Sequence, residues 1–164
     1  MHGMKTQAFR ITGLPVEPFR ELFALEDAEL ARRNIERRVA DSPFAFPCRV
    51  TLEDASPGEE LLLLSYAHQP AATPYAASGP IFVRRHAART GIAVNEVPDQ
   101  QRRRLLSVRA YDEHHYLVDA DVTPGTELQS LIDRFFGDER IGYLHVHNAR
   151  QGCYACRVER LRQD

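Results

Sequence analysis

Period-two alternation is the feature of this sequence that most constrains its fold. Four runs in the second half of the chain alternate apolar and polar residues, at 105–112, 116–122, 141–148 and 154–161. Side chains that alternate in this way point to opposite faces of a strand, so each run predicts a half-buried strand. Polar turns at 113–115 and 149–152 join the runs in pairs, which predicts two antiparallel hairpins.

One helix stands out between these hairpins. Apolar residues recur at helical spacing at Leu128, Leu131, Ile132 and Phe135, and the pattern ends at Gly137. Shorter helical patterns near the N-terminus, at 19–23 and 27–33, follow a strand-like segment at 8–12. The chain therefore combines many strands with one main helix.

The middle of the chain reads as further strands and loops. Alternation at 48–52, the turn Ser56-Pro57-Gly58 and the apolar run 61–64 predict a hairpin. Three prolines within 68–80 predict a long irregular loop before a strand at 81–84. The polar stretch 86–104 predicts a connection with one helical turn.

Together these patterns predict an α+β fold with a mainly antiparallel or mixed β-sheet, one main helix in the C-terminal half and short N-terminal helices. The 164 residues, 43% of them hydrophobic and 27% charged, fit a single domain spanning residues 1–164.

Composition also limits the partners that we expect. The 21 Lys and Arg against 23 Asp and Glu give a formal charge of -2, which lacks the basicity of most nucleic-acid-binding domains. No stretch reaches the roughly 20 apolar residues that a membrane span needs, and residues 1–10 lack the apolar segment of a signal peptide. Three cysteines do not form a paired disulfide framework. We therefore expect a cytoplasmic protein that binds neither nucleic acid nor membranes.

The string Tyr143-Leu144-His145-Val146-His147-Asn148 is the most suggestive constellation. Residues two apart on a strand share a face, so His145 and His147 should bring their imidazoles together. Such a pair suits a divalent metal such as zinc, or proton transfer. A metal needs a further ligand, and the sequence leaves four candidates open: His68, Cys153, Asp119 and Asp121. Alternatively, the two histidines lie on a half-exposed face without a ligand.

Cys153 and Cys156 have the Cys-x-x-Cys spacing of redox pairs and zinc sites. In one strand they would point to opposite faces with Cα atoms roughly 10 Å apart, which predicts no disulfide. Tyr154, Cys156 and Val158 share the apolar parity, so Cys156 should be a packed core thiol, and Cys153 on the other face is the more available one. A structural zinc site of Cys48, Cys153, Cys156 and one histidine remains an alternative.

Three arginines interrupt apolar segments and need partners: Arg49, Arg84 and Arg109. The partners are either carboxylates of the protein or an anionic ligand. Tyr75 in the proline-rich loop either covers such a ligand or packs the loop down.

Several short strings, taken as a set, resemble a known family. They are Phe46-Pro47-Cys48-Arg49-Val50, Thr73-Pro74-Tyr75, Ser78-Gly79-Pro80-Ile81-Phe82-Val83-Arg84, and His145-Val146-His147-Asn148-Ala149 with Gly152-Cys153. The family is catalogued as domain of unknown function 1203, and the similarity runs from about residue 9 to residue 160. The resemblance implies a stand-alone bacterial domain without an assigned activity.

Our leading hypothesis is a pocket for a small anionic molecule, with or without catalysis. In it His145, His147 and Cys153 would carry any chemistry, while His68, Tyr75, Arg84, Arg109 and Asn148 would bind the ligand. A non-catalytic metal-binding or regulatory module is the alternative. A weaker alternative is a nucleotide hydrolase resembling the histidine-triad proteins, although Ala149 stands where that signature has its third histidine.

Overall fold

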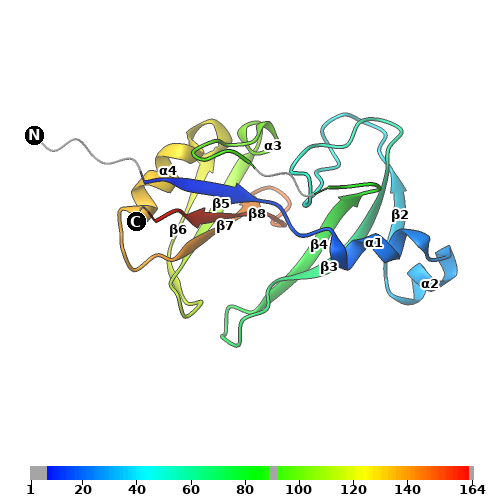
Figure 1. Cartoon of the computed structure of the whole chain (residues 1–164), viewed down its shortest axis with the longest axis horizontal. Helices are drawn as coiled ribbons and strands as arrows, with labels where there is room; N and C mark the ends of the chain where they lie inside the picture. The colour runs from blue at the N-terminus through cyan, green and yellow to red at the C-terminus, as the bar shows by residue number, and fades with distance from the viewer. Residues whose placement is uncertain (1–6, 89–91, 163–164) are drawn as a thin grey trace, which may run out of the picture.

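The computed structural model describes residues 7–88 and 92–162 and arranges them around two antiparallel sheets (Figure 1). The larger sheet has the strand order β1-β8-β7-β5-β6. Its strands are β1 (Phe9–Thr12), β5 (Leu105–Tyr111), β6 (Leu117–Pro124), β7 (Tyr143–Asn148) and β8 (Tyr154–Arg160). The smaller sheet has the order β2-β3-β4, with β2 (Glu36–Val39), β3 (Glu60–Gln69) and β4 (Ala77–Arg84).

Short helices accompany these sheets. The α-helices are α1 (Glu17–Arg20), α2 (Asp27–Arg32), α3 (Asp99–Arg102) and α4 (Leu128–Phe136), with 3-10 turns η1 (Glu21–Ala24) and η2 (Gly125–Glu127). The α+β class, the main helix in the C-terminal half and the short N-terminal helices are confirmed. Among the helices of residues 7–88 and 92–162, none has the length and hydropathy needed to cross a membrane.

Helix α4 covers one face of the five-stranded sheet. Its Leu131, Ile132 and Phe135 belong to the same buried cluster as Leu144 and Val146 of β7. Every residue of β7 is nevertheless buried, so the opposite face of this strand is covered as well. That second face carries the alternate residues of β7, among them both histidines.

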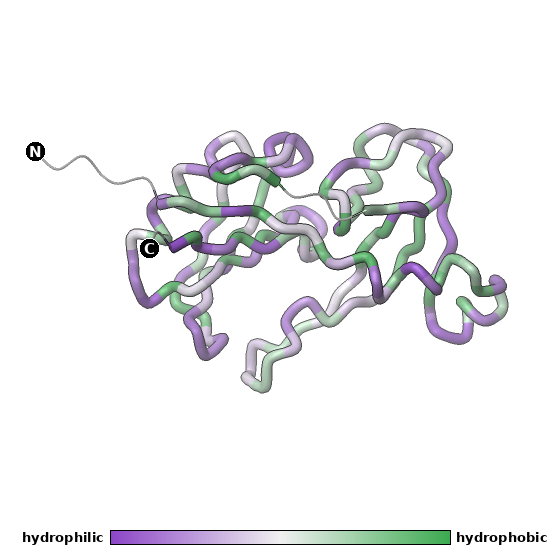
Figure 2. Tube along the Cα trace, viewed as in Figure 1, coloured by the Kyte–Doolittle hydropathy of each residue, from purple (hydrophilic) through white to green (hydrophobic). Residues whose placement is uncertain are grey.

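The three-stranded sheet has its own core. Phe19 of α1 and Leu30 of α2 pack with Leu62, Ile81 and Val83 of the sheet. Hydrophobic segments follow β3 and β4 in Figure 2, whereas β2 at the edge of the sheet is mainly hydrophilic. Strand β2, with the sequence Glu-Arg-Arg-Val, is an edge strand without an apolar pattern, and the sequence did not reveal it.

The predicted strand at 48–52 is wrong. Cys48 forms only an isolated parallel bridge with Phe82, and its backbone N–H donates to the carbonyl oxygen of Glu53 at 3.0 Å, which closes a tight loop. Leu52 has a φ of 56°, a left-handed conformation that ends any strand. Consequently β2 and β4, not residues 48–52, are the neighbours of β3.

The predicted loop at 68–80 is much shorter than expected. Strand β3 continues to Gln69 and β4 begins at Ala77, so Pro80 lies within a strand. This long hairpin of the smaller sheet extends beyond β2 toward the larger sheet (Figure 1). Its end is tied to the larger sheet, because the side-chain amide of Gln69 donates to the Tyr143 hydroxyl at 2.8 Å. The hairpin therefore brings β3 onto the second face of β7.

Candidate functional site

Strand β7 presents both histidines on one buried face. Leu144 and Val146 point into the core under α4, and His145 and His147 point the other way. Their side chains are 2% and 1% exposed. The strand pairs antiparallel with β8, so the predicted arrangement of the two imidazoles is confirmed. The half-exposed alternative is wrong, because the hairpin of the smaller sheet covers this face.

His68 of β3 supplies a third imidazole. One ring nitrogen from each of His68, His145 and His147 lies within 4.8 Å of the other two. The ring centroid of His68 is 5.2 Å from that of His147 and 6.2 Å from that of His145. The tertiary structure thus brings one of the four candidate ligands to the pair.

The two aspartate candidates lie elsewhere. Asp119 and Asp121 are exposed on the edge strand β6, where each carboxylate accepts the backbone N–H of the next residue. Asp121 also forms an ion pair with Arg134. Neither the aspartates nor any cysteine joins the three-histidine group within residues 7–88 and 92–162.

Tyr154 holds the three rings in place. It stacks on His68 at a centroid distance of 5.1 Å and an interplanar angle of 4°, and it meets His145 edge-on at 5.1 Å. Tyr154 is buried, but the predicted strand face that it shares with Cys156 is wrong. A bulge shifts the register, so that Val146 pairs with Cys156 but His147 pairs with Tyr154. The extra residue reverses the parity of Tyr154 and turns it to the histidine face.

Each of the three histidines has a buried ring nitrogen without a hydrogen-bond partner among the described residues. His147 Nδ1 is 3.0 Å from the carbonyl oxygen of Gly152, which can only accept, so Nδ1 carries the proton and Nε2 is bare. In the described part of the chain, His147 Nε2, His145 Nδ1 and His68 Nδ1 are buried and have no hydrogen-bond partner. Buried polar atoms normally have one, so three orphaned nitrogens on histidines that lie together point to a site for an ion.

Burial keeps these imidazoles neutral. Desolvation lowers the pKa of His145 to about 3 and that of His147 to about 4, and it also lowers the pKa of His68. The positive charge of Arg109 acts in the same direction on all three histidines. Neutral imidazole is the form that binds metal ions.

A pocket of about 230 Å³ opens beside the trio. Its walls come from β3, β4, β5 and the β7–β8 turn, and the residues that line it are His68, Ala77, Ser78, Gly79, Pro80, Arg109, His147, Gln151, Gly152, Cys153 and Tyr154. Arg109 lies directly across from His145 in the β5–β7 register. No described residue forms a hydrogen bond or an ion pair with its guanidinium. The pocket therefore offers a cation without a partner among the described residues, next to the imidazoles of His68 and His147.

Cys153 also borders this pocket, in the turn before β8. Its Sγ accepts from Arg49 Nη2 at 3.1 Å and contacts Asn148 Nδ2 at 3.7 Å. All three cysteines are free, which agrees with the predicted absence of a disulfide between Cys153 and Cys156. Cys156 is buried in the core of the larger sheet and Cys48 in that of the smaller one, so the alternative four-ligand site is not assembled.

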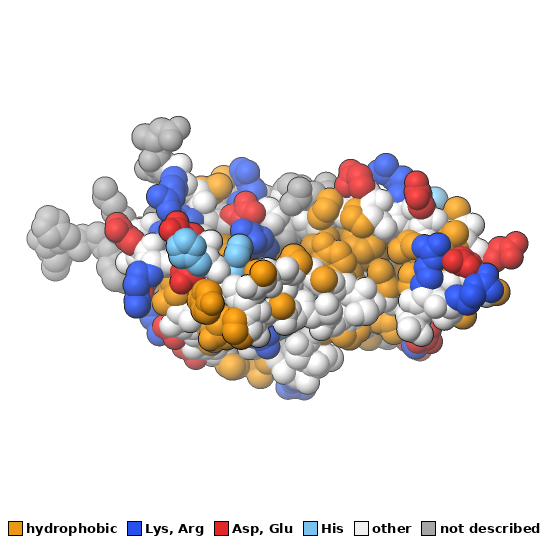
Figure 3. Space-filling model, turned by 90° about the horizontal axis from the view of Figure 1, so that it is seen from below, with side chains coloured by type: hydrophobic (Ala, Val, Ile, Leu, Met, Phe, Trp, Pro, Cys, Tyr) orange, Lys and Arg blue, Asp and Glu red, His pale blue; other side chains and the backbone are white. Residues whose placement is uncertain are grey.

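Three of the proposed ligand-binding residues do not line the pocket: Asn148, which contacts Cys153, and Arg84 and Tyr75, which lie farther away. Arg84 binds Glu59 Oε1 through Nη2 at 2.6 Å and belongs to an ion pair of the protein. Tyr75 packs edge-on against Tyr111 and Tyr116 and holds the hairpin end down. On the face seen from below, charged side chains gather toward the ends and uncharged ones occupy the middle (Figure 3).

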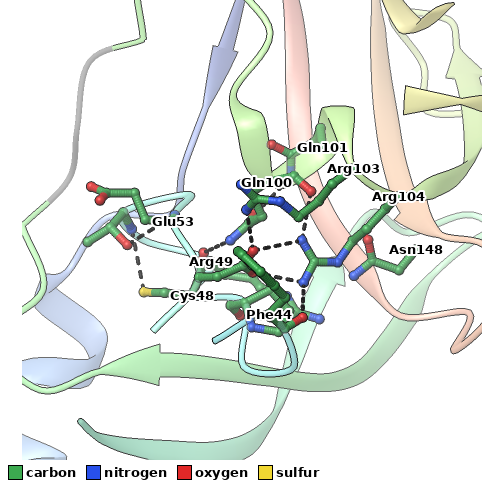
Figure 4. A network of polar contacts seen from close by, with 12 residues as sticks. Phe44, Cys48, Arg49, Glu53, Gln100, Gln101, Arg103, Arg104 and Asn148 are labelled. Atoms are coloured by element: carbon green, nitrogen blue, oxygen red, sulfur yellow. Dashed lines mark hydrogen bonds and ion pairs between the residues drawn. The ribbon is translucent and has the colours of Figure 1, made fainter. Parts of the chain in front are cut away.

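Two contributors were missed at the level of sequence. The sequence predicts the wrong strand face for Tyr154, because a bulge leaves no signal in an alternating pattern. For Arg49 the sequence predicts only that the side chain needs a partner. In the structure it is 2% exposed and contacts Cys153 behind the pocket. Figure 4 shows Arg49 among polar side chains from separate segments, including Cys48, Gln100 and Arg104.

Comparison with known proteins gives a family but no activity. No curated protein and no solved structure matches the chain. Residues 45–160, which include β3, β4 and the whole of the site described above, match a family described as protein of unknown function (DUF1203). This match covers most of the 164 residues, and the chain therefore belongs to the DUF1203 family.

Proposed function

We propose that this protein binds a divalent metal ion, with zinc as the best candidate, through His68, His145 and His147. The observation that carries the proposal is that His68, His145 and His147 each offer a ring nitrogen within 4.8 Å of the other two, and that each has a buried ring nitrogen without a hydrogen-bond partner among the described residues. Zinc prefers imidazole ligands at roughly 2.0–2.1 Å, which separates the donors of a tetrahedral site by roughly 3.4 Å.

The supporting contacts resemble those around metal-binding histidines in general. A ligand histidine usually donates its other ring N–H to a carbonyl or carboxylate, which fixes the ring and its tautomer. His147 makes this contact with Gly152, at the position where a φ of 79° turns the chain. Tyr154 fixes the rings further by stacking.

The pocket beside the proposed metal site provides space for a further ligand of the metal. Three protein ligands leave one coordination position of zinc open, as in catalytic zinc sites, whereas structural sites have four protein ligands. The unpaired Arg109 favours an anionic group there, such as a carboxylate or a phosphate. A bound zinc ion would act as a Lewis acid toward that anion. We therefore propose a small anionic molecule as the ligand or substrate of the site.

The metal is tested directly on the purified protein. Elemental analysis after purification without chelators and without a polyhistidine tag should find about one equivalent of zinc or another divalent metal. Calorimetric titration of the stripped protein should show one site, which His68→Ala weakens by roughly 100-fold or more because a ligand is lost. His114→Ala is the matched control, since that side chain is 77% exposed. Equal affinity of the two variants would refute the proposal.

The anion is tested on the zinc-loaded protein. Phosphate or acetate should raise the melting temperature of the wild type, since a ligand that binds the folded state stabilises it. Arg109→Met should remove this response while zinc stoichiometry stays the same. An unchanged response in Arg109→Met would refute the role of the arginine and leave the metal site untouched.

The thiols support a proposal about location. All three cysteines are free, and free thiols persist in reducing compartments. We propose that the protein works in the cytoplasm.

A further inference from the structure

A buried arginine without a carboxylate partner lies directly behind the pocket. Arg49 is 2% exposed, and its guanidinium donates to the carbonyl oxygens of Tyr154 at 2.8 Å and Pro47 at 2.5 Å. Its third contact is with the Sγ of Cys153, 3.1 Å from Nη2. Arginine stays protonated in proteins, so this is a permanent positive charge in the interior.

The charge of Arg49 needs compensation. Burying an unpaired ion costs several kcal/mol in general, and carbonyl dipoles offset only part of this. Among the described residues, no carboxylate lies within ion-pairing distance of Arg49. Asp54, in the neighbouring network, already binds Arg103 and Arg104. Within residues 7–88 and 92–162, the one ionisable group at hydrogen-bonding distance from the guanidinium of Arg49 is the thiol of Cys153.

Cys153 differs from the other two thiols in access. It is half-buried and lines the pocket, whereas Cys48 and Cys156 are buried in the cores. The sulfur of Cys48 accepts the backbone N–H groups of Thr51 and Arg84, and burial raises the pKa of Cys156 to about 12. A second donor, Asn148 Nδ2, lies 3.7 Å from the sulfur of Cys153.

We infer that Cys153 is a nucleophilic thiolate with Arg49 as its counter-ion, and that it reacts with small electrophiles that carry a negative charge. The thiolate lone pair forms a bond from sulfur to the electrophilic carbon, and the leaving group departs with the electrons of the bond that breaks. No proton moves. Arg49 is a positioning residue, since it acts through the sulfur. The preference for an anion rests on the role of Arg109 in the proposed function, while the reactivity of the thiol does not.

Alkylation of the wild-type protein tests the inference without any variant that must fold. Iodoacetamide is added at pH 7 with a chelator present, and peptide mapping by mass spectrometry follows each cysteine in the folded protein and in urea. A half-buried ordinary thiol reacts more slowly when folded. Cys153 should instead react roughly tenfold faster in the folded protein than in urea, as expected for a stabilised thiolate. Cys48 and Cys156 should be protected by folding, which makes them internal controls.

Variants then identify the partners of the thiolate. Arg49→Met should remove the acceleration and Arg49→Lys should restore part of it, because the positive charge returns. Arg103→Met is the matched control from the neighbouring network, and it should leave the rate unchanged. If Cys153 of the wild type reacts no faster when folded than in urea, the inference is overturned, whatever the variants do.

The charge of the reagent tests the anionic preference. The ratio of iodoacetate to iodoacetamide rates should be several-fold higher in the folded protein than in urea, and Arg109→Met should abolish that difference. Equal ratios in both states would overturn the preference for anions. Because the chelator removes any metal, these outcomes are independent of zinc binding, which is measured separately.

Discussion

Acid should lower the free energy of unfolding of the metal-free protein, because its buried histidines are neutral in the folded state. The size of this effect can be calculated for His147. Its pKa is lowered from 6.5 to about 4 by desolvation, so the unfolded chain binds a proton at pH 5 that the folded protein does not. Stability therefore falls as pH drops below about 6.5, and this contribution levels off near pH 4. One pKa unit corresponds to about 1.4 kcal/mol, so His147 alone lowers the free energy of unfolding by about 2 kcal/mol between pH 7 and pH 5.

The variant His147→Asn isolates this contribution. Asparagine places an amide N–H near Nδ1, where it can still donate to the Gly152 carbonyl, but it does not titrate. Urea denaturation with a chelator, at pH 7 and pH 5, gives the loss of stability for each protein. The loss should be about 2 kcal/mol smaller in His147→Asn than in the wild type. His114→Asn, at an exposed position, should show the wild-type loss.

An equal loss of stability in the wild type and in His147→Asn would contradict the proposed state of the site. Carboxylates titrate in the same pH range in all three proteins, so only the difference between variants is informative. If His147→Asn and the wild type lose the same stability, His147 is not held neutral by burial. The convergence of bare ring nitrogens would then lose its physical basis.

Three substitutions test other parts of the structure. Leu144→Ala should lower the free energy of unfolding by about 3 kcal/mol in urea titrations, because it leaves a cavity beneath α4; a loss below about 1 kcal/mol would contradict that packing. Gly152→Ala should cost about 1 kcal/mol, since its φ is 79°, and it should also weaken zinc binding by displacing the carbonyl that orients His147. Normal zinc affinity in calorimetry would argue against that orienting contact. Arg84→Met should cost at most about 1 kcal/mol, because its ion pair with Glu59 is only partly buried, and it should leave the anion response of the zinc-loaded protein intact. Loss of this anion response would indicate that Arg84 takes part in binding the anion.

Strand parity made part of the site predictable. Side chains alternate along a strand whatever surrounds it, so the string around His145 and His147 was enough to place both imidazoles on one face. The same rule failed for Tyr154, because a bulge inserts one extra residue between it and Cys156. Bulges depend on how two strands pair, and the residues of one strand do not encode them.

The choice among candidate partners was also a matter of tertiary structure. His68, Cys153, Asp119 and Asp121 are equally suitable as ligand types, and only the path of the β3–β4 hairpin brings His68 to the pair. The three arginines also differ in their contacts. Arg84 forms an ion pair with a carboxylate and Arg49 donates to a thiol, whereas the guanidinium of Arg109 has no hydrogen-bond or ion-pair partner within the described residues.

By itself, then, the sequence determined the α+β class, the main helix, the two C-terminal hairpins and the position of His145 and His147 on one face of a strand. These follow from periodicity, which is a property of local backbone geometry. The tertiary structure alone decided that a second sheet covers the histidine face, that His68 completes the trio, and that Arg49 and Arg109 lie behind and beside one pocket. These depend on contacts between segments far apart in the chain, whose geometry is set by packing rather than by local pattern.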